Sequence, residues 1–538
     1  MERYFLVAAL ILGVAADTFF AMINFYPVAP PRSRGPQRQI VAEMDTGHAR
    51  WFTQNVLEEF NHEHNVNLVL RPMPGDQIIE TLRTARGHDD VLLASIPLAL
   101  TRRAFDDHLV RPIDQLAPRD QIARDFGEIR SEVMASARVG DQQVFLPRMT
   151  VLDLAVYRPS KVRDAVLHWL EARPAIEAAL RSVNGRGLPE GYELERSPAE
   201  WDSYDLFVIG FFWAHRRYGD LPAHARIAHR SDPGIPGDTY LLSELYRAGA
   251  TDATIRTFDS PAAQDHMAWE SIFRREGLYP AGMYAEGGMS AEAMVGSFIQ
   301  GRVFLAPVDE TEAFRIHGGA RREVEAQVDD PDDLGFAAMP RGVSLALDAN
   351  GRPQRSVEGF SFREDSVWAR PLGGTGDDRL AYEFLKFVWT RQTHIRECEA
   401  VGILPLRTDI VNERASIFRL DWQQEIFEGA LAQWSRAEPV PPALIDQGIG
   451  ERYMRHWLMF MNAAPQGFTL ESIANGLRSP SPAPPAAPPQ PHEDPDAPRD
   501  DGVPWRSEPS LDLPNGDTAT VGDAAAVTDA SATTRGAR

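Results

Sequence analysis

The chain has 538 residues, of which 43% are hydrophobic, and 77 acidic residues against 55 basic residues give a formal net charge of -22. This length and hydrophobic content suffice for several folded domains, so the chain is not wholly disordered. The acidic balance excludes a nucleic-acid binder, whose affinity depends on Lys and Arg at phosphates. Because Cys398 is the single cysteine, no intramolecular disulfide and no cysteine-built zinc site can form.

The N-terminal segment, residues 1–30, contains an apolar run at residues 4–26 that only Asp17, Thr18 and Asn24 interrupt. Such a run is typical of a cleaved signal peptide or of an uncleaved N-terminal membrane anchor. Residues 31–37, rich in Pro and Arg, are expected to link it to the folded body. Both interpretations direct the protein to a membrane. The Arg residues after the run favour the cytoplasmic side by the positive-inside rule, so the membrane orientation stays open.

The C-terminal segment, residues 479–538, contains 12 of the 41 prolines, ten acidic residues and four basic ones. Such a segment can bury little apolar surface to offset the entropy lost on ordering. We therefore expect a disordered tail, either an inert solvated extension or a Pro-rich ligand for a partner protein.

The body, residues 38–478, begins with alternating strand and helix patterns. Short apolar runs at residues 39–44, 66–70 and 91–94 predict strands, and helical spacing follows at residues 51–60 and 77–85. This alternation favours an α/β fold with a mostly parallel sheet and crossover helices. Ligands bind such sheets at the carboxyl ends of strands, which places Asp45, Thr46 and Ser95 at the predicted site.

Several motifs then follow in an order shared with a known family. They are Leu-Val-Arg-Pro-Ile-Asp at residues 109–114, Gly-Asp-Gln-Gln-Val-Phe-Leu-Pro at 140–147, Leu-Ala-Val-Tyr-Arg at 154–158, Ser-Pro-Ala-Glu-Trp-Asp at 197–202, Gly-Leu-Tyr-Pro at 277–280, Phe-Ile-Gln-Gly-Arg at 298–302, Ala-Tyr-Glu-Phe-Leu-Lys-Phe at 381–387 and Gly-Ile-Leu-Pro-Leu-Arg at 402–407. In this order the chain resembles the extracellular solute-binding proteins of ABC importers, family 1, the class that includes maltose-binding protein.

The resemblance implies a two-lobed periplasmic-binding-protein type II fold, in which each lobe is a mostly parallel sheet flanked by helices and a hinge joins the lobes. We expect the first lobe to comprise residues 38–147 and 293–365, and the second lobe residues 148–292 and 366–478. The ligand would then lie in the cleft between the lobes.

Further candidate ligand-binding residues come from the resemblance. Tyr157 occupies the family's Tyr-Asn strand, where its ring could stack on a sugar; a half-buried strand tyrosine is the alternative. Asp309 and Glu310 stand where many members have a ligand-facing Gly-x-Trp, and a solvated loop is their alternative. Glu358 and Phe360 lie in a stretch that resembles the family's cleft-facing turn.

No catalytic, metal or cofactor motif is present, since the chain lacks phosphate-loop, nucleophile-elbow and His-Glu-x-x-His patterns. We therefore predict no enzyme activity, no metal site and no cofactor. A glycosidase stays open as an alternative, because two carboxylates about 5 to 9 Å apart can assemble on folding; it would require a pair such as Asp309 and Glu310 to face the cleft.

The resemblance predicts a function for the whole chain. It implies an extracytoplasmic protein, in the periplasm or on the outer face of the cell membrane, that captures a small polar ligand such as a carbohydrate for an ABC permease. The alternative is a membrane-tethered sensor or scaffold that keeps the fold and recruits a partner through the Pro-rich tail.

Overall fold

The computed structural model describes residues 36–84, 90–218, 221–222, 226–285, 287–318, 330, 332–373, 377–463 and 469–478. All of them belong to one unit of the chain, residues 1–481. The predicted membrane segment (residues 1–30), most of the linker (31–37) and the predicted tail (479–538) lie outside the described residues. Among the helices in the described ranges, none combines the length and the apolar character that a bilayer span requires.

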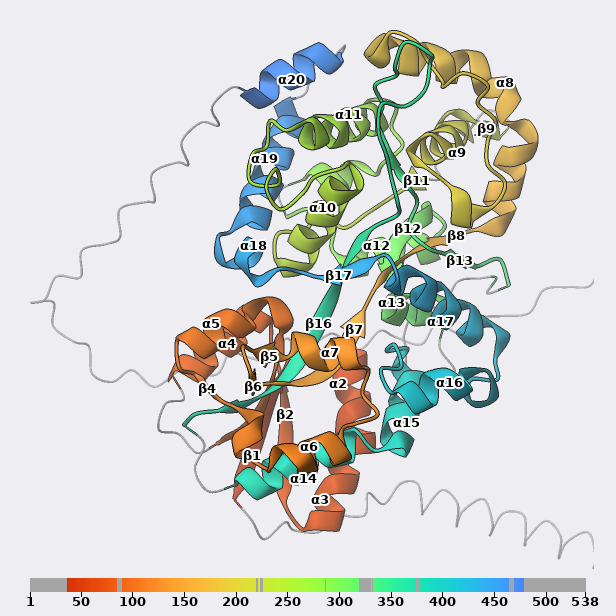
Figure 1. The fold of residues 1–538 in the computed structure, drawn as a ribbon. Helices are drawn as coiled ribbons and strands as arrows, with labels where there is room; N and C mark the ends of the chain where they lie inside the picture. Colours follow the sequence, from red (N-terminus) through yellow and green to blue (C-terminus); the bar gives the residue numbers. More distant parts are fainter. Residues whose placement is uncertain are drawn as a thin grey trace, which may run out of the picture. The chain divides into compact units, whose positions relative to one another are not determined.

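The first lobe is built on a sheet with the strand order β17-β16-β3-β1-β2 (Figure 1). The strands of this path are β1 (Gln37–Ala42), β2 (Asn67–Pro72), β3 (Val91–Pro97), β16 (Ser361–Pro371) and β17 (Ala437–Pro439), and two further strands of the same sheet pair with β16. β1 pairs in parallel with β2 and β3, whereas β16 runs antiparallel to β3. Six of the seven residues of β3 are buried, as expected for a strand that is covered on both faces.

Helices cover this sheet and fill its core with aromatic rings. One continuous helical segment comprises α2 (Thr46–Phe52), the π-helical turn η1 (Thr53–Leu57) and α3 (Glu58–His64). Phe52 and Phe60 of this segment contact Phe384 of α14 (Asp378–Val388), with ring centroids 6.4 Å and 5.0 Å apart. The remaining elements of this lobe are α4 (Gly75–Thr84), η2 (Leu98–Leu100), α5 (Thr101–Asp106), β4 (Val110–Arg111), η3 (Ile113–Gln115), α6 (Arg119–Asp125), α7 (Ser131–Ser136), β5 (Arg138–Val139), β6 (Gln142–Gln143), α15 (Arg391–Val401) and α16 (Thr408–Ile417).

The second lobe has a smaller sheet with the order β11-β12-β8-β13. Its strands are β8 (Asp153–Tyr157), β11 (Arg226–Ile227), β12 (Val303–Asp309) and β13 (Gly335–Ala337). β12 and β13 both run antiparallel to β8. The expected mostly parallel sheets are therefore mixed sheets in both lobes, because β8 and β16 each pair with antiparallel neighbours that lie far away in the sequence.

Helices make up most of the second lobe. They are α8 (Pro159–Asn184), α9 (Ser203–His215), α10 (Ile235–Arg247), α11 (Pro261–Arg275), α12 (Ala291–Ile299), α13 (Glu310–His317), α17 (Asp421–Trp434), α18 (Pro442–Asp446), α19 (Ile449–Ala463) and α20 (Leu470–Arg478). Short elements join them: η4 (Pro198–Glu200), β9 (Arg217–Tyr218), β10 (Leu221–Pro222), η5 (Ala281–Tyr284), β14 (Gly342–Val343) and β15 (Ser356–Val357). Trp201 is fully buried here, and Cys398 is fully buried in the first lobe.

The assignment of later segments to the lobes needs a correction. Residues 293–365 were expected in the first lobe, but β12 pairs with β8 of the second sheet. Residues 366–478 were expected in the second lobe, but the end of β16 pairs with β3, and α14 packs against α2 and α3 in the first. The expectation was wrong because β12 and β16 are both buried strands, and the composition of a buried strand does not indicate which of two sheets it joins.

Two strands run side by side where the chain passes between the lobes (Figure 1). β7 (Leu146–Val151) pairs antiparallel with β16, with Val151 opposite Glu364 and Thr150 opposite Asp365. β7 continues directly into β8 of the second sheet. Side chains at these positions therefore lie at the junction of the two lobes.

Candidate functional site

A cleft of about 370 Å³ lies between the lobes. Its first-lobe wall comes from the chain after β1, the end of β3 and the paired strands β7 and β16. Its second-lobe wall comes from residues 230–239, the start of α12, the end of β12 and helix α13. This position, at strand ends and between two lobes, is where α/β proteins commonly bind small molecules.

Arg230 lines the cleft, is only 4% exposed and pairs with three acidic side chains. Its Nη2 lies 2.9 Å from Oδ2 of Asp309 and 2.7 Å from Oε2 of Glu312, and its Nη1 lies 3.5 Å from Oε1 of Glu364. Burial by itself would lower the pKa of Arg230, but Glu312 and Asp309 outweigh burial and raise it well above its usual range. Since Glu364 is on β16, this ion-pair group connects both lobes.

Two carboxyl groups around Arg230 titrate near or above neutral pH instead of in the acidic range. Burial raises the pKa of Glu364 to about 8, although Arg230 opposes the shift. Burial likewise raises the pKa of Glu312 to about 7, again against Arg230. One guanidinium does not compensate three enclosed carboxylates, so part of the negative charge is removed by protonation.

Asp309 and Glu312 are positioned by the start of α13. The Oδ1 atom of Asp309 accepts a hydrogen bond from the backbone N–H of Glu312 at 2.8 Å, and Oε2 of Glu312 accepts one from the N–H of Asp309 at 3.1 Å. This reciprocal pair is a capping box, which an acidic residue followed three positions later by Glu favours. The helix start thus holds both carboxylates at the cleft.

A second charged pair lies on β16. Nε of Arg363 donates to Oδ2 of Asp365 at 2.9 Å, and Oγ1 of Thr150 donates to Oδ1 of the same carboxylate at 2.7 Å. Burial raises the pKa of Asp365, with Arg363 and Thr150 opposing the shift. These contacts hold the side chains of Arg363 and Asp365 in place on the wall that β7 and β16 form.

Two of the eight residues predicted from the sequence line the cleft. Asp45 caps α2, where its Oδ1 accepts a hydrogen bond from the N–H of His48 at 3.0 Å, and it faces the cleft from the first lobe. Asp309 faces it from the second lobe. The rule that ligands bind at strand ends thus located Asp45, and the family position located Asp309.

The other six predicted residues lie outside the cleft lining. Thr46 is exposed at the start of α2, and Ser95 is buried between Ala42 of β1 and Trp368 of β16. The ring of Tyr157 packs against Trp201, with centroids 5.4 Å apart.

Glu310 is fully buried, and its Oε2 accepts a hydrogen bond from the N–H of Leu152 at 2.8 Å. Glu358 is exposed and lies 3.5 Å from Arg436, and Phe360 stacks on Tyr246. A hydrolase would require Asp309 and Glu310 to face the cleft together. Asp309 lines the cleft and Glu310 does not, so this pair is not formed there.

Most of the charged cleft residues were missed by the sequence reasoning, including Arg230, Asp232, Glu312, Glu364 and Asp365. The Asp-x-x-Glu pattern at residues 309–312 was a usable sign of a capped helix start and could have drawn attention to Glu312. Nothing local distinguishes Arg230 or Glu364 from surface residues, because their partners lie far away in the sequence. Within the described ranges, no group of three or more His, Cys, Asp and Glu side chains could hold a metal ion.

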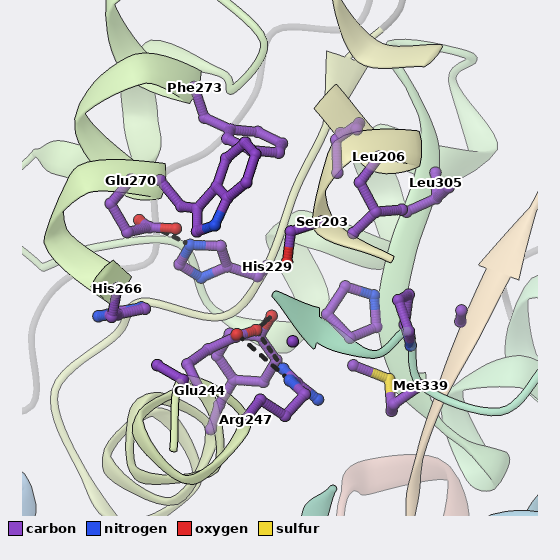
Figure 2. A pocket seen from close by; sticks show the side chains of 18 of the residues that line it. Ser203, Leu206, His229, Glu244, Arg247, His266, Glu270, Phe273, Leu305 and Met339 are labelled. Carbon is purple, nitrogen blue, oxygen red and sulfur yellow. Dashed lines mark hydrogen bonds and ion pairs between the residues drawn. The ribbon is translucent and has the colours of Figure 1, made fainter. Parts of the chain in front are cut away.

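A second, smaller pocket of about 80 Å³ lies inside the second lobe (Figure 2). In this view His229 is directed toward Glu270, with Nε2 3.2 Å from Oε2, and Glu244 forms an ion pair with Arg247. Burial by itself would raise the pKa of Glu244, but Arg247 outweighs burial and holds this pKa at about 2. Because these charges pair with one another and the space fits only a few water molecules, the interlobe cleft is the candidate ligand site.

Comparison with solved structures shows the fold. A maltose-bound Thermotoga maritima MalE3 is 13% identical, with a TM-score of 0.59, and the match covers 82% of this chain and 98% of that one. A Thermotoga lettingae ABC-transporter solute-binding protein bound with α-D-tagatose is 14% identical, with a TM-score of 0.57 and coverage of 83% and 98%. The GacH receptor of Streptomyces glaucescens, solved without ligand and with acarbose, is 15% identical, with a TM-score of 0.55 and coverage of 82% and 96%.

The chain therefore has the two-lobed fold of maltose-binding-protein-like solute-binding proteins, as the ordered motifs predicted. No protein-family model matches the chain, and no curated protein sequence matches it.

Proposed function

We propose that this protein is an extracytoplasmic solute-binding protein that captures a small polar ligand, such as a carbohydrate, in the interlobe cleft and delivers it to an ABC permease. The observation that carries the proposal is the cleft itself, whose charged and apolar side chains come from both lobes of a solute-binding fold. The solved neighbours with this fold are described as bound to maltose, tagatose or acarbose, which supports a polar, hydroxyl-rich ligand.

The proposed mechanism is ligand-dependent closure of the lobes. A ligand that contacts both walls binds the closed form more tightly than the open form, and this differential affinity shifts the population toward closure. β7 and β16 carry cleft residues and connect the sheets, so they are suited to act as the hinge. A permease would then recognise the closed form.

Within this proposal, Asp45 and Asp309 are the predicted ligand-binding residues that face the cleft. The protein would act in the periplasm or on the outer face of the cell membrane, with residues 1–30 as signal peptide or anchor. Recruitment of a partner by residues 479–538, the sensor or scaffold alternative, remains a prediction for a segment outside the described residues.

The test is a thermal-shift screen of the purified full-length protein against neutral sugars, sugar acids, amino sugars, polyols, amines and short peptides. A ligand at 100 times its dissociation constant adds about 2.7 kcal/mol to the free energy of unfolding, so a true ligand raises the melting temperature measurably. Binding is then confirmed by calorimetry, and the Asp309→Asn variant should weaken it. A folded protein that none of these classes stabilises would contradict the proposed function.

A further inference from the structure

The charges of the cleft are unbalanced. Among the described residues that line it, eight are Asp or Glu and three are Arg, a surplus of five acids. Protonation of Glu312 and Glu364, whose pKa values burial raises to about 7 and about 8, still leaves a surplus of three. A cleft of this charge attracts cations and repels anionic solutes such as sugar acids.

Several acids of the cleft are already paired within the protein. Asp309 and Glu312 bind Arg230 at 2.9 and 2.7 Å, and Asp365 binds Arg363 at 2.9 Å. Asp232 differs from them, because its Oδ1 is buried and accepts no hydrogen bond. Burial raises the pKa of Asp232, and its own backbone N–H and, more weakly, Arg230 partly offset this rise. A buried acceptor without a donor costs free energy, and a ligand donor would remove that cost.

Two more buried polar groups in the cleft wall lack partners. The Oγ1 atom of Thr239, a residue that is only 1% exposed, has no hydrogen-bond partner, and neither has Nε of Arg230. Thr239 and Arg230 line the same cleft as Asp232. The hydroxyl of Thr239 can accept a hydrogen bond from a ligand, and Nε of Arg230 can donate one. Among the described residues, the second-lobe wall thus contains two buried acceptors and one buried donor without a hydrogen-bond partner in the protein.

The remaining wall is aliphatic. The described side chains that line the cleft include Leu98, Met149, Val151 and Ile235, but no Phe, Tyr or Trp. Neutral sugars usually gain affinity from aromatic rings that cover their apolar faces, and the cleft lining lacks such a platform. The attraction for a ligand must therefore come from charge and hydrogen bonds, supported by contact with aliphatic groups.

We propose that the ligand of this cleft carries a positively charged ammonium group, which donates hydrogen bonds to Asp232 and Thr239 of the second lobe. The acids of the first-lobe wall, Glu43 and Asp45, add to its attraction when the lobes close. This inference rests on the proposed function, because it assumes that the interlobe cleft is where the solute binds. An amino sugar and an aliphatic diamine share this chemistry. A metal ion does not fit, since the described residues include no cluster that could hold one.

The test compares solutes that differ in charge but little in shape. The full-length protein is titrated calorimetrically with glucosamine, N-acetylglucosamine and glucose, and in parallel with putrescine and spermidine. We expect at least one ammonium-bearing solute to bind about tenfold or more tightly than both neutral sugars, and its affinity to fall as salt rises from about 50 to about 500 mM. Tighter binding of glucosamine indicates an amino sugar, and tighter binding of putrescine or spermidine indicates an aliphatic amine.

Variants locate the interaction. Asp232→Asn keeps the size of the side chain and removes its charge, so it should weaken ammonium binding about tenfold or more and reduce the salt dependence. Thr239→Val should weaken binding without changing the salt dependence. Glu428→Gln is the matched control, because Glu428 is exposed, pairs with Arg414 and does not line the cleft.

The outcomes separate this inference from the proposed function. If glucose or N-acetylglucosamine binds as tightly as every amine, or if no amine binds while a neutral solute does, the ammonium inference is overturned and the binding function stands. If the folded protein binds none of the classes in the wider screen, both are overturned.

Discussion

Nη2 of Arg230 and Oε2 of Glu312 lie 2.7 Å apart with both side chains almost fully buried, and both residues line the interlobe cleft. Arg230 also pairs with Asp309 and Glu364. It is therefore the shared partner of three enclosed carboxyl groups, two of which have raised pKa values, and we expect the stability of the cleft to depend on it.

Replacing Arg230 should destabilise the protein strongly. Arg230→Met leaves buried carboxylates without a compensating charge, a change that typically costs about 3 to 5 kcal/mol of the free energy of unfolding. Urea unfolding at pH 7.5 measures the loss, which should be smaller at pH 5, where the carboxylates protonate more readily. Arg414→Met is the control, since its ion pair with Glu428 is largely exposed and should contribute less than about 1 kcal/mol. Equal losses in the two variants would contradict the central role of Arg230.

The pH dependence of stability should reflect Glu364. Its pKa is about 8 in the folded protein because of burial, against an ordinary value of 4.5. Between these two pH values the folded state holds a proton that the unfolded state has released. The free energy of unfolding therefore falls as pH rises from about 4.5 to about 8, by at most about 1.4 kcal/mol per pH unit for one carboxyl group.

Glu364→Gln removes this titration, so the urea midpoint of the variant should decline less between pH 5 and pH 8 than that of the unaltered protein. Glu428→Gln, at an exposed position, should leave the slope as it is. A slope that Glu364→Gln does not change would show that Glu364 is ionised throughout this range.

A buried charge cluster in the first lobe predicts a different pH effect. Oε1 of Glu397 lies 2.7 Å from Nε2 of His48, and Oε2 accepts a hydrogen bond from Nη1 of Arg148 at 3.1 Å. Burial raises the pKa of Glu397, but Arg148 and His48 outweigh burial and hold it at about 2. The stability that this ionised group contributes is present above about pH 4.5 and is lost as pH falls toward 2.

Glu397→Gln should lower the free energy of unfolding by about 3 kcal/mol at pH 7, because the buried Arg148 loses its counter-charge. The variant should also lose less further stability than the unaltered protein between pH 4.5 and pH 3. Urea titrations at these three pH values measure both effects. Glu413→Gln serves as the control, since the ion pair of Glu413 with Arg391 is exposed.

Tyr157 was expected to bind ligand, but it does not line the cleft that the structure shows. Its variants therefore test which of the two sites is used. Because its ring packs against Trp201, Tyr157→Phe should change ligand affinity by less than about twofold. Tyr157→Ala should instead lower the free energy of unfolding, by about 2 kcal/mol, through lost packing. Calorimetry with the ligand from the screen and urea unfolding measure the two effects. A tenfold loss of affinity in Tyr157→Phe would return this residue to the ligand site.

The sequence by itself determined the fold class. The alternation of strand and helix patterns before residue 95 and the order of the later motifs predicted the two-lobed α/β architecture that the structural neighbours show. Asp45 was located because a strand end followed by a helix start is a local feature.

Only the tertiary structure decided which lobe holds β12 and β16 and which side chains form the cleft. β12 pairs with β8, and β16 pairs with β3, across long stretches of intervening sequence, so neither pairing is encoded in a local pattern. Arg230, Glu312 and Glu364 likewise become one charged group only when distant segments pack together. The local sequence indicates which secondary structure a segment favours. The charge and shape of a cleft depend instead on which segments the packed core brings together.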